Sequence, residues 1–417
     1  MQVAGIIAEY NPFHNGHAYH IAQTRRAGAT HIMAVMSGNF VQRGEPAVLE
    51  KRARAEMALL GGADLVLELP MPWCCARAQD FARAGVTLLH ATGCVQTLAF
   101  GSECGDIERL QHAARALDTP QLRECLRDFL AQGLPLAAAR EKAAAQCLGE
   151  KAASLLRGAN DALALEYLRA LEHVHSPIRP LAIRRAAAAH DSAGMSGGFC
   201  SASHLRSLLL QGNPAWSGAM PAQAVEILLR EMAAGKAPIC YPVLETAILA
   251  QLRRMTPEDW AALPDISEGL EYRLYRAARY AASLEEFFIA AKTKRYTHAR
   301  IRRLALHAFL GVTREAMRLS PPYLRVLGFN ERGQELLRRM RNTATLPVLM
   351  RASELRRLSS DAHYIYQLNA QTTDLFALAM PHKQPCGLEQ RENAKIMLEP
   401  MQTDERTEGA RHGRSKI

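Results

Sequence analysis

Residues 8–17 read Ala8-Glu9-Tyr10-Asn11-Pro12-Phe13-His14-Asn15-Gly16-His17, directly after a short apolar run, Val3 to Ala8. The apolar run predicts a buried strand, and the periodic residues after it predict a helix. Two histidines three positions apart can then face one ligand where the strand ends and the helix begins. A helix that begins near Gly16 also offers free backbone N–H groups and a positive dipole. The segment therefore predicts a phosphate site.

The histidine pair has two other interpretations. Histidine at a helix start is often a cap or a packing residue, and an H-x-x-H spacing also occurs in metal sites. Metal-binding pairs usually need a third ligand and often lie four residues apart on a helix. This pair brackets a strand-to-helix turn, so we predict no bound metal. Imidazoles over that turn suit nucleotidyl transfer, because they can stabilise charge that develops on phosphate oxygens.

The first hundred residues alternate short apolar runs with helical periodicity, which predicts βαβ units and an α/β fold with a parallel sheet. The first expected helix ends at Gly28. Ligands of such sheets bind beyond the carboxyl ends of the strands, where small and polar residues follow here. The expected strands are Val3 to Ala8, His31 to Met36, Leu65 to Leu69 and Gln96 to Phe100.

The remainder of the chain is mostly helical in pattern. Residues 107–174 read as helical, residues 178–185 as a further strand, and a polar loop then extends to Gly198. Beyond Trp216 strand signals nearly vanish, which predicts an α-helical second domain. The expected helices there are Ala222 to Met232, Leu270 to Ala290 and Arg300 to Leu310. We predict a nucleotide-binding catalytic domain at 1–215, a basic helical domain at 216–400 and a disordered tail at 401–417.

Length and composition favour a soluble, folded protein. The chain has 417 residues, of which 48% are hydrophobic. It contains no stretch of roughly 20 apolar residues and no secretory leader pattern, so we expect no membrane association and a cytoplasmic location. The nine cysteines show no C-x-x-C pair and are expected to be reduced thiols.

The net charge of +10 is concentrated in one segment. Residues 291–360 contain 16 lysines and arginines against four glutamates, an excess of 12 positive charges. This concentration favours a polyanion partner, because contacts from Lys and Arg to phosphate dominate nucleic-acid affinity. A solvated basic helix face is the alternative. The candidate RNA-binding residues interleave cations with an aromatic ring: Lys292, Lys294, Arg295, Tyr296, Arg300, Arg302 and Arg303.

A second phosphate element lies at residues 201–206, which read Ser-Ala-Ser-His-Leu-Arg. Ser201 and Ser203 lie at an expected helix start, and Arg206 follows one turn later. Serine caps are routine by themselves. Together with the histidine turn, the segment becomes a candidate polyphosphate clamp.

These residues carry a family resemblance. The N-P-F-H-N-G-H run and the serine–arginine segment resemble the HxGH nucleotidylyltransferase superfamily, which has a Rossmann-like parallel sheet. Longer blocks resemble the bacterial tRNA(Met) cytidine acetate ligases, and the resemblance covers most of the chain except the tail. These blocks are Ser37 to Ala47 (SGNFVQRGEPA), Asp64 to Pro70 (DLVLELP), Phe100 to Glu103 (FGSE), Glu166 to Leu168 (EYL) and Lys292 to Thr297 (KTKRYT).

The resemblance implies an enzyme that joins acetate to ATP as acetyl-adenylate. It would then acetylate the N4 amine of the wobble cytidine in elongator tRNA(Met), with Mg²⁺ accompanying the triphosphate. His14 and His17 would be catalytic. The implied ATP site comprises Ile7, Ala8, Glu9, Tyr10, Asn11, Pro12, Phe13, His14, Asn15, Gly16, His17, Ala18, Tyr19, His20, Gly101, Asn160, Arg185, Ser201, Ser203 and Arg206. A small-molecule nucleotidylyltransferase and a non-catalytic RNA-binding protein are the alternatives.

Overall fold

The computed structural model describes residues 1–185, 198–267 and 269–397. Most of the predicted polar loop and the predicted tail at 401–417 lie outside the described residues. Within them, an eight-stranded sheet has the order β10-β8-β5-β2-β1-β6-β7, and β9 also pairs with β8. Its strands are β1 (Val3–Ala8), β2 (His31–Ser37), β5 (Leu65–Leu69), β6 (Thr97–Ser102), β7 (Arg179–Arg184), β8 (Leu324–Asn330), β9 (Val348–Leu349) and β10 (Lys395–Met397).

The predicted parallel sheet is confirmed in β5-β2-β1-β6-β7, whose strands are all parallel. The chain moves outward from β1 through β2 and β5, and then returns to the other side of β1 with β6. Ligands of α/β sheets bind at such a switch point, beyond the carboxyl ends of the strands. The switch point here lies between β1 and β6, directly beside the histidine turn.

The region beyond Trp216, which the sequence predicts to be α-helical because strand signals nearly vanish there, also contains three strands among its described residues. Strand β8 pairs antiparallel with β5, and β9 and β10 pair parallel with β8. The sequence pattern concealed β8 because Arg325 interrupts its apolar run within a basic segment. Arg325 is nevertheless buried, with its guanidinium 3.5 Å from Glu389 and over the ring of Tyr366. Residues far beyond the expected boundary thus complete the sheet.

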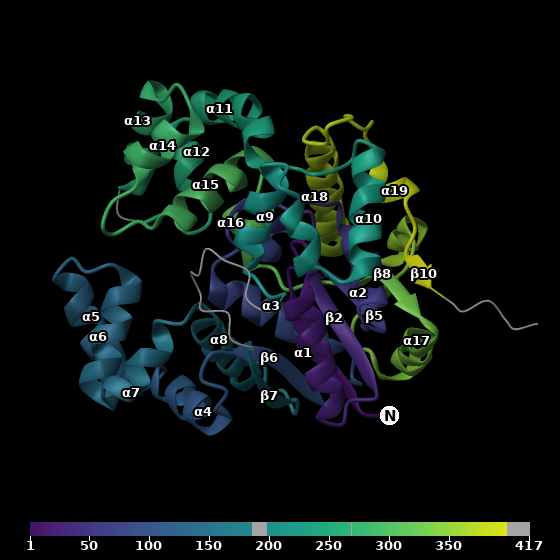
Figure 1. Cartoon of the computed structure of the whole chain (residues 1–417). Helices are drawn as coiled ribbons and strands as arrows, with labels where there is room; N and C mark the ends of the chain where they lie inside the picture. Colours follow the sequence, from purple (N-terminus) through teal and green to yellow (C-terminus); the bar gives the residue numbers. More distant parts are fainter. Residues whose placement is uncertain (186–197, 268, 398–417) are drawn as a thin grey trace, which may run out of the picture.

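Helices cover both faces of the sheet (Figure 1). Alternate residues of β1 enter different cores: Ala4 and Ile6 belong to one cluster, whereas Val3 and Ile7 belong to the other. The first cluster is covered by α1 (Asn15–Arg26), α2 (Lys51–Leu60), α9 (Ala202–Leu210) and α10 (Ala222–Ala233). The second is covered by α3 (Ala78–Ala91), α4 (Ile107–Ala116), α8 (Ala159–His173) and α17 (Glu331–Thr343).

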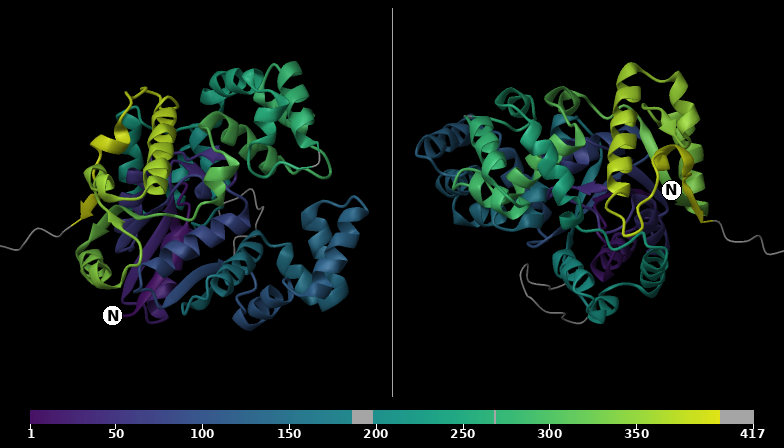
Figure 2. Two further views of the ribbon diagram at one scale, coloured as in Figure 1. Left: turned by 180° about the vertical axis from the view of Figure 1, so that it is seen from behind. Right: turned by 90° about the horizontal axis from the view of Figure 1, so that it is seen from above.

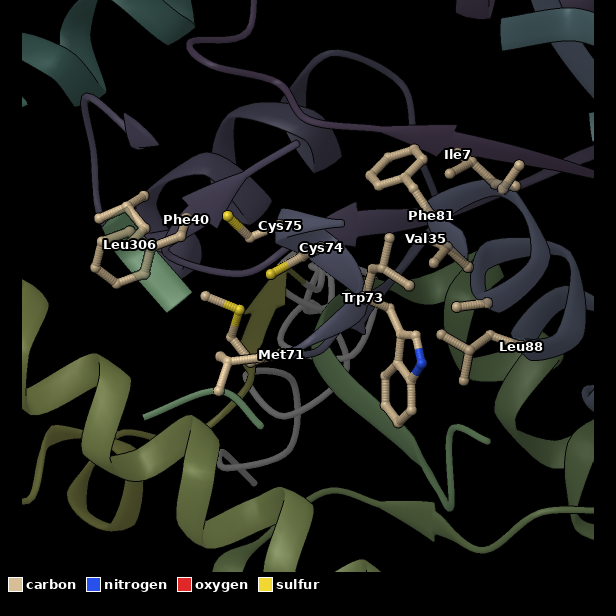
Figure 3. Close-up of a cluster of buried hydrophobic side chains, with 14 of the residues drawn as sticks. Ile7, Val35, Phe40, Met71, Trp73, Cys74, Cys75, Phe81, Leu88 and Leu306 are labelled. Carbon is tan, nitrogen blue, oxygen red and sulfur yellow. The ribbon is translucent and has the colours of Figure 1, made fainter. Parts of the chain in front are cut away.

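Figure 3 shows the second core beside the sheet, where Trp73, Phe81 and Leu88 pack among strand residues such as Val35. The near-continuous apolar run of β1 is typical of a strand buried on both faces. Gly5 permits close packing there, because a Cβ atom at Gly5 would lie 2.7 Å from a methyl group of Leu89.

Two helical groups project from the side of the sheet opposite β10 (Figures 1 and 2). The first comprises α5 (Pro120–Ala131), α6 (Leu136–Leu148) and α7 (Glu150–Ala153). The second comprises α11 (Glu245–Arg254), α12 (Pro257–Ala261), α13 (Leu270–Tyr280), α14 (Leu284–Ala291), α15 (His298–Leu310) and α16 (Arg314–Arg318). The expected helix Leu270 to Ala290 is two helices, because the backbone becomes extended at Ala281 and Ser283 then caps a new helix.

The remaining elements link these layers. They are the hairpin β3 (Phe40–Val41) and β4 (Glu45–Pro46), helices α18 (Ser360–Ala377) and α19 (Leu388–Arg391), and the 3₁₀ turns η1 (Trp73–Cys75), η2 (Ser154–Leu156), η3 (Pro214–Ala219), η4 (Tyr241–Leu244) and η5 (Ala352–Arg357). A buried ionic cluster joins α19 to the sheet: the Lys51 ammonium lies 2.7 Å from Glu68 and 2.6 Å from Glu389. Among the described residues, no helix is both long and apolar enough to cross a membrane.

Candidate active site

The histidine turn has the predicted position, between the end of β1 and the start of α1. His14 is the N-cap of α1, and its Nδ1 accepts a hydrogen bond from Gly16 N at 3.0 Å. The Nδ1 of His17 accepts from His14 N at 3.2 Å. The two side chains thus form a reciprocal cap. One expectation is corrected here: the N–H of Gly16 is not free, because the imidazole of His14 is its acceptor.

These hydrogen bonds define which ring nitrogens carry protons. An Nδ1 that accepts from the backbone has no proton, so each neutral ring carries its proton on Nε2. Burial, aided by the charges of Arg185 and Arg206, lowers the pKa of His14 to about 3. Burial and the neighbouring His14, His20 and Arg185 lower the pKa of His17 well below its usual range. Both rings are therefore neutral Nε2–H donors at physiological pH.

Aromatic packing fixes the orientation of these rings. The imidazoles of His14 and His17 are stacked with centroids 3.7 Å apart. The ring of Tyr10 lies edge-on to His17 at 4.8 Å and to Phe13 at 5.0 Å. Tyr10 has a φ of +47°, a region that bulky residues rarely adopt, so the turn stores some backbone strain. Tyr10 and Phe13 are almost fully buried and support the turn from beneath.

The candidate site contains buried polar atoms on the turn and on α1. Within the described part of the chain, Asn11 Nδ2 and His20 Nε2 are buried and make no hydrogen bond. Burial, together with Arg185, lowers the pKa of His20 to about 4, so this ring is also neutral. Buried polar groups are nearly always satisfied in a functional state. These groups fit a polar ligand, and residues 15–20 keep partial exposure to receive one.

The ends of β6 and β7 bring three further predicted residues together. Arg185 donates to Asn160 Oδ1 at 3.1 Å, and Gly101 lies beside Arg185, since a Cβ atom at Gly101 would be 3.6 Å from its Cγ. Glu103 accepts from Asn160 Nδ2 at 2.6 Å and from Asp161 N at 2.6 Å. Burial raises the pKa of Glu103, but these hydrogen bonds together lower it by more, so the net pKa lies below its usual value. Glu103 is therefore a charged carboxylate that holds Asn160 in place.

Asp161 has a structural role that the sequence did not reveal. Its carboxylate accepts from the backbone N–H of Glu103 at 2.9 Å and of Cys104 at 3.1 Å, and from the hydroxyl of Ser102. Burial, with the nearby charge of Glu103, raises the pKa of Asp161. Asp161 closes the turn after β6, and Glu103 then holds Asn160. A carboxylate at the start of a helix, two residues into α8, was the available signal.

The predicted clamp at residues 201–206 folds back onto the histidine turn. Ser201 caps α9 by accepting from His204 N at 3.2 Å. Arg206 donates to Asn11 O at 3.0 Å and to Glu45 Oε1 at 2.5 Å. Ser203 Oγ accepts from Arg43 at 3.3 Å. Asn11 and Arg206, which lie 195 positions apart in the sequence, thus meet at the candidate site.

Two residues that support the candidate site, Arg54 and Glu45, were not predicted. Glu45 is the carboxylate partner of Arg206. Arg54 is fully buried and donates to the backbone carbonyls of Leu49 (3.0 Å), Glu9 (2.6 Å) and Ser37 (3.2 Å). It thereby ties together the loops that follow β1 and β2. Its sequence neighbourhood, Lys-Arg-Ala-Arg, is typical of an exposed basic helix, so only the tertiary structure reveals its burial.

The candidate RNA-binding residues divide into two sets. Lys292, Lys294 and Arg295 are exposed beside the N-terminus of α15. Arg302 is half-buried, with 34% of its side chain exposed, whereas Tyr296, Arg300 and Arg303 are engaged within the protein. Arg300 donates to Asp265 O at 2.6 Å, and Nη2 of Arg303 lies 3.8 Å from Asp265 Oδ2. The ring of Tyr296 is covered, with the guanidinium of Arg300 at 5.2 Å, and presents little surface to a base.

Clusters of metal ligands and surface hollows are other features that can mark a functional site. Among the described residues, no group of three or more His, Cys, Asp or Glu side chains is arranged to hold a metal ion. A hollow of about 650 Å³ lies beside α17, but none of the predicted site residues lines it.

Comparison with known proteins defines the class of this fold. A family model described as HIGH Nucleotidyl Transferase matches residues 1–391. The crystal structure of Thermotoga maritima TmcAL bound with alpha-thio ATP has a TM-score of 0.90 and 34% identity, and covers 96% of this chain and 100% of that chain. The chain thus has the fold of a HIGH nucleotidyl transferase.

The relatives define the particular family. The tRNA(Met) cytidine acetate ligase of Acetivibrio thermocellus is 35% identical and covers 95% of this chain and 100% of its own length. That of Caldanaerobacter subterraneus is 36% identical over 91% of this chain and 96% of its own length. The chain belongs to the tRNA(Met) cytidine acetate ligase family, as the sequence motifs predicted.

Proposed function

We propose that this protein is an ATP-dependent acetate ligase that acetylates N4 of the wobble cytidine in elongator tRNA(Met). The observation that carries the proposal is the pair of neutral Nε2–H donors at the start of α1, flanked by Arg185 and Arg206. Donors and cations in this arrangement suit a reacting phosphate. The names of the relatives support the same activity.

The first step is adenylate formation. An acetate oxygen attacks the α-phosphorus of ATP, the bond to the β-phosphate oxygen breaks, and pyrophosphate leaves. Charge accumulates on the phosphate oxygens during this step, and the Nε2–H groups of His14 and His17 would stabilise it. Arg206 would hold the leaving polyphosphate, with Ser201 and Ser203 beside it. Mg²⁺ would enter with the triphosphate.

The second step is acyl transfer. The N4 amine of cytidine attacks the acetyl carbonyl, AMP leaves with the bonding electron pair, and the amine loses one proton. The mixed anhydride is needed because acetate is a poor acyl donor and an amine on a cytosine ring is a weak nucleophile. The exposed cations Lys292, Lys294 and Arg295 would contact the tRNA backbone, which the protein would encounter in the cytoplasm.

Acetate-dependent release of pyrophosphate from ATP tests the first step, and mass spectrometry of tRNA incubated with ATP and acetate tests the second. The proposal expects N4-acetylcytidine only when both small substrates are present. Pyrophosphate release without acetylated tRNA would favour a small-molecule nucleotidylyltransferase. Absence of both products, with tRNA still bound, would favour a non-catalytic RNA-binding protein.

A further inference from the structure

The hairpin β3–β4 lies between the nucleotide site and helix α15. On the nucleotide side, Gln42 N donates to Glu9 Oε1 at 2.9 Å, and Arg43 reaches Ser203. On the other side, Gly44 contacts α15 so closely that a Cβ atom there would lie 2.6 Å from the backbone N of Arg303. Gly44 also has a φ of +78°, which favours glycine. The hairpin therefore connects the two regions by direct packing.

Glu45, on β4, interacts with one arginine from each region. Its Oε1 accepts from Arg206 at 2.5 Å, and its Oε2 lies 3.9 Å from Arg302 Nη1. The side chains of Glu45 and Arg206 are 19% and 16% exposed, so solvent screens their pairing only in part. One carboxylate is thus shared between the proposed polyphosphate clamp and the candidate RNA-binding segment.

A single carboxylate cannot fully neutralise two guanidinium groups. Arg206 has a second acceptor in Asn11 O, at 3.0 Å. Arg302 is less well satisfied: its Nε is buried and makes no hydrogen bond within the described residues, and its guanidinium lies over Phe288 at 5.7 Å. An anion that binds one of these arginines will therefore weaken its ion pair with Glu45, and Glu45 can then pair more strongly with the other arginine.

We infer that Glu45 is a positioning residue that makes polyphosphate binding and RNA binding oppose one another. This inference rests on the proposed function. A bound polyphosphate draws Arg206 away from Glu45, and Glu45 then pairs more closely with Arg302, which becomes less available to RNA phosphate. After pyrophosphate leaves, Arg206 returns to Glu45 and Arg302 is released. RNA then binds best to the acetyl-adenylate form, when the acetyl group is ready for transfer.

The inference is tested by tRNA binding to the full-length protein with and without saturating inorganic pyrophosphate, at constant ionic strength. We expect pyrophosphate to weaken tRNA binding about five-fold in the wild type, a common size for coupling between sites. In Glu45→Gln this dependence should vanish, and pyrophosphate itself should bind more tightly, because its competitor for Arg206 has lost its charge. Damage to the fold would weaken pyrophosphate binding instead.

Two further variants make the test specific. Arg302→Gln removes the other partner of Glu45 and should also abolish the pyrophosphate dependence. Glu56→Gln is the matched control, because Glu56 pairs with Arg230 at 2.7 Å away from the hairpin, and it should retain the wild-type dependence. The inference is overturned if pyrophosphate does not weaken tRNA binding to the wild type, or if it weakens tRNA binding to Glu45→Gln as much as to the wild type. Acetylation of tRNA by the wild type would in that case leave the proposed function standing. If the wild type neither acetylates nor binds tRNA, the proposed function is overturned as well.

Discussion

In the proposed reaction His14 and His17 act through their Nε2 atoms, because the backbone of the same turn occupies both Nδ1 atoms. A neutral imidazole in this state can donate to a phosphate oxygen without first acquiring a proton. Its donor is already aimed when charge develops, so little reorganisation is needed during the reaction. At the scale of single residues, the tautomer and the burial of the two imidazoles thus determine their donor capacity more than their charge does.

Changing His17 to Ala should lower acetate-dependent pyrophosphate exchange by about 10²- to 10³-fold, the usual effect of removing one transition-state donor. The dissociation constant for tRNA should change less than about two-fold, because His17 lies outside the basic segment at α15. Exchange kinetics and tRNA titrations measure the two effects. His90→Ala, on α3, is the control and should retain exchange. Equal losses of exchange and tRNA affinity would contradict this division of labour.

His307 gives the protein a pH dependence of stability that is separate from the reaction. It is buried, its Nε2 lies 2.7 Å from Cys75 O, and burial lowers its pKa to about 4. The unfolded chain takes up this proton near pH 6.5, whereas the folded protein does so only near pH 4. Between these values the unfolded state binds more protons, so stability falls as the pH falls.

Urea unfolding between pH 6.5 and 5 should therefore show a shallower decline of stability in His307→Gln than in the wild type. The difference in slope should approach about 1.4 kcal/mol per pH unit toward pH 5, the value for one proton. Glutamine keeps a donor for the Cys75 carbonyl, which limits other damage. The exposed His112 offers the control substitution, His112→Gln, whose slope should match the wild type. Parallel slopes for His307→Gln and the wild type would contradict the buried neutral state.

At the scale of elements, the N-terminus of α15 and the hairpin β3–β4 place cations in two different roles. Arg300 and Arg303 bind backbone or carboxylate oxygens around Asp265 and stabilise the connection between helices. Lys292 and Lys294 extend into solvent before α15. Charge excess alone therefore overstates the number of cations that are available to a polyanion.

Replacing Lys292 and Lys294 together by Ala should weaken tRNA binding and make it less sensitive to salt. The slope of log K against log salt should fall by about 0.7 to 0.9 for each RNA phosphate that no longer has a lysine partner. Titrations of tRNA over a series of salt concentrations give this slope. Pyrophosphate exchange should stay near the wild-type rate. An unchanged slope would place the RNA elsewhere on the protein.

At the scale of the whole molecule, the sheet depends on residues from both ends of the chain. Strand β8 pairs with β5, and Glu389 on α19 lies within 3.6 Å of Lys51, Arg52 and Arg325. Burial would favour a neutral Glu389, but these three cations lower its pKa to about 2. Without the C-terminal elements, Lys51 and Arg52 would be buried without this partner, which is costly.

A fragment of residues 1–215 should consequently fail to fold cooperatively, although it contains every residue of the proposed ATP site. It would expose the edge of β5 and lack the charge partners of α2. Thermal unfolding followed by circular dichroism, together with limited proteolysis, compares the fragment with the full chain. A cooperative melt and a protease-resistant fragment would show that the proposed domain boundary marks an independent unit.

The sequence by itself determined the parallel strands, the histidine turn and the family, because each of these is written in contiguous residues. Apolar runs reveal strands buried on both faces, and a strand–turn–helix pattern positions His14 and His17 through local hydrogen bonds. Even the helix start at Ser201 is a local signal. The predicted roles of individual ATP- and tRNA-binding residues stay predictions.

Only the tertiary structure decided which distant residues meet. Arg325 is a buried strand residue because Glu389 and Tyr366 surround it, and Arg54 is buried because it satisfies carbonyls from two loops. Glu45 lies between Arg206 and Arg302 because a hairpin packs against α15. The energies of buried charges depend on partners that are remote in sequence, so no local pattern reveals them. For that reason the chemistry of the turn could be predicted from the sequence, whereas its connection to the basic helix could not.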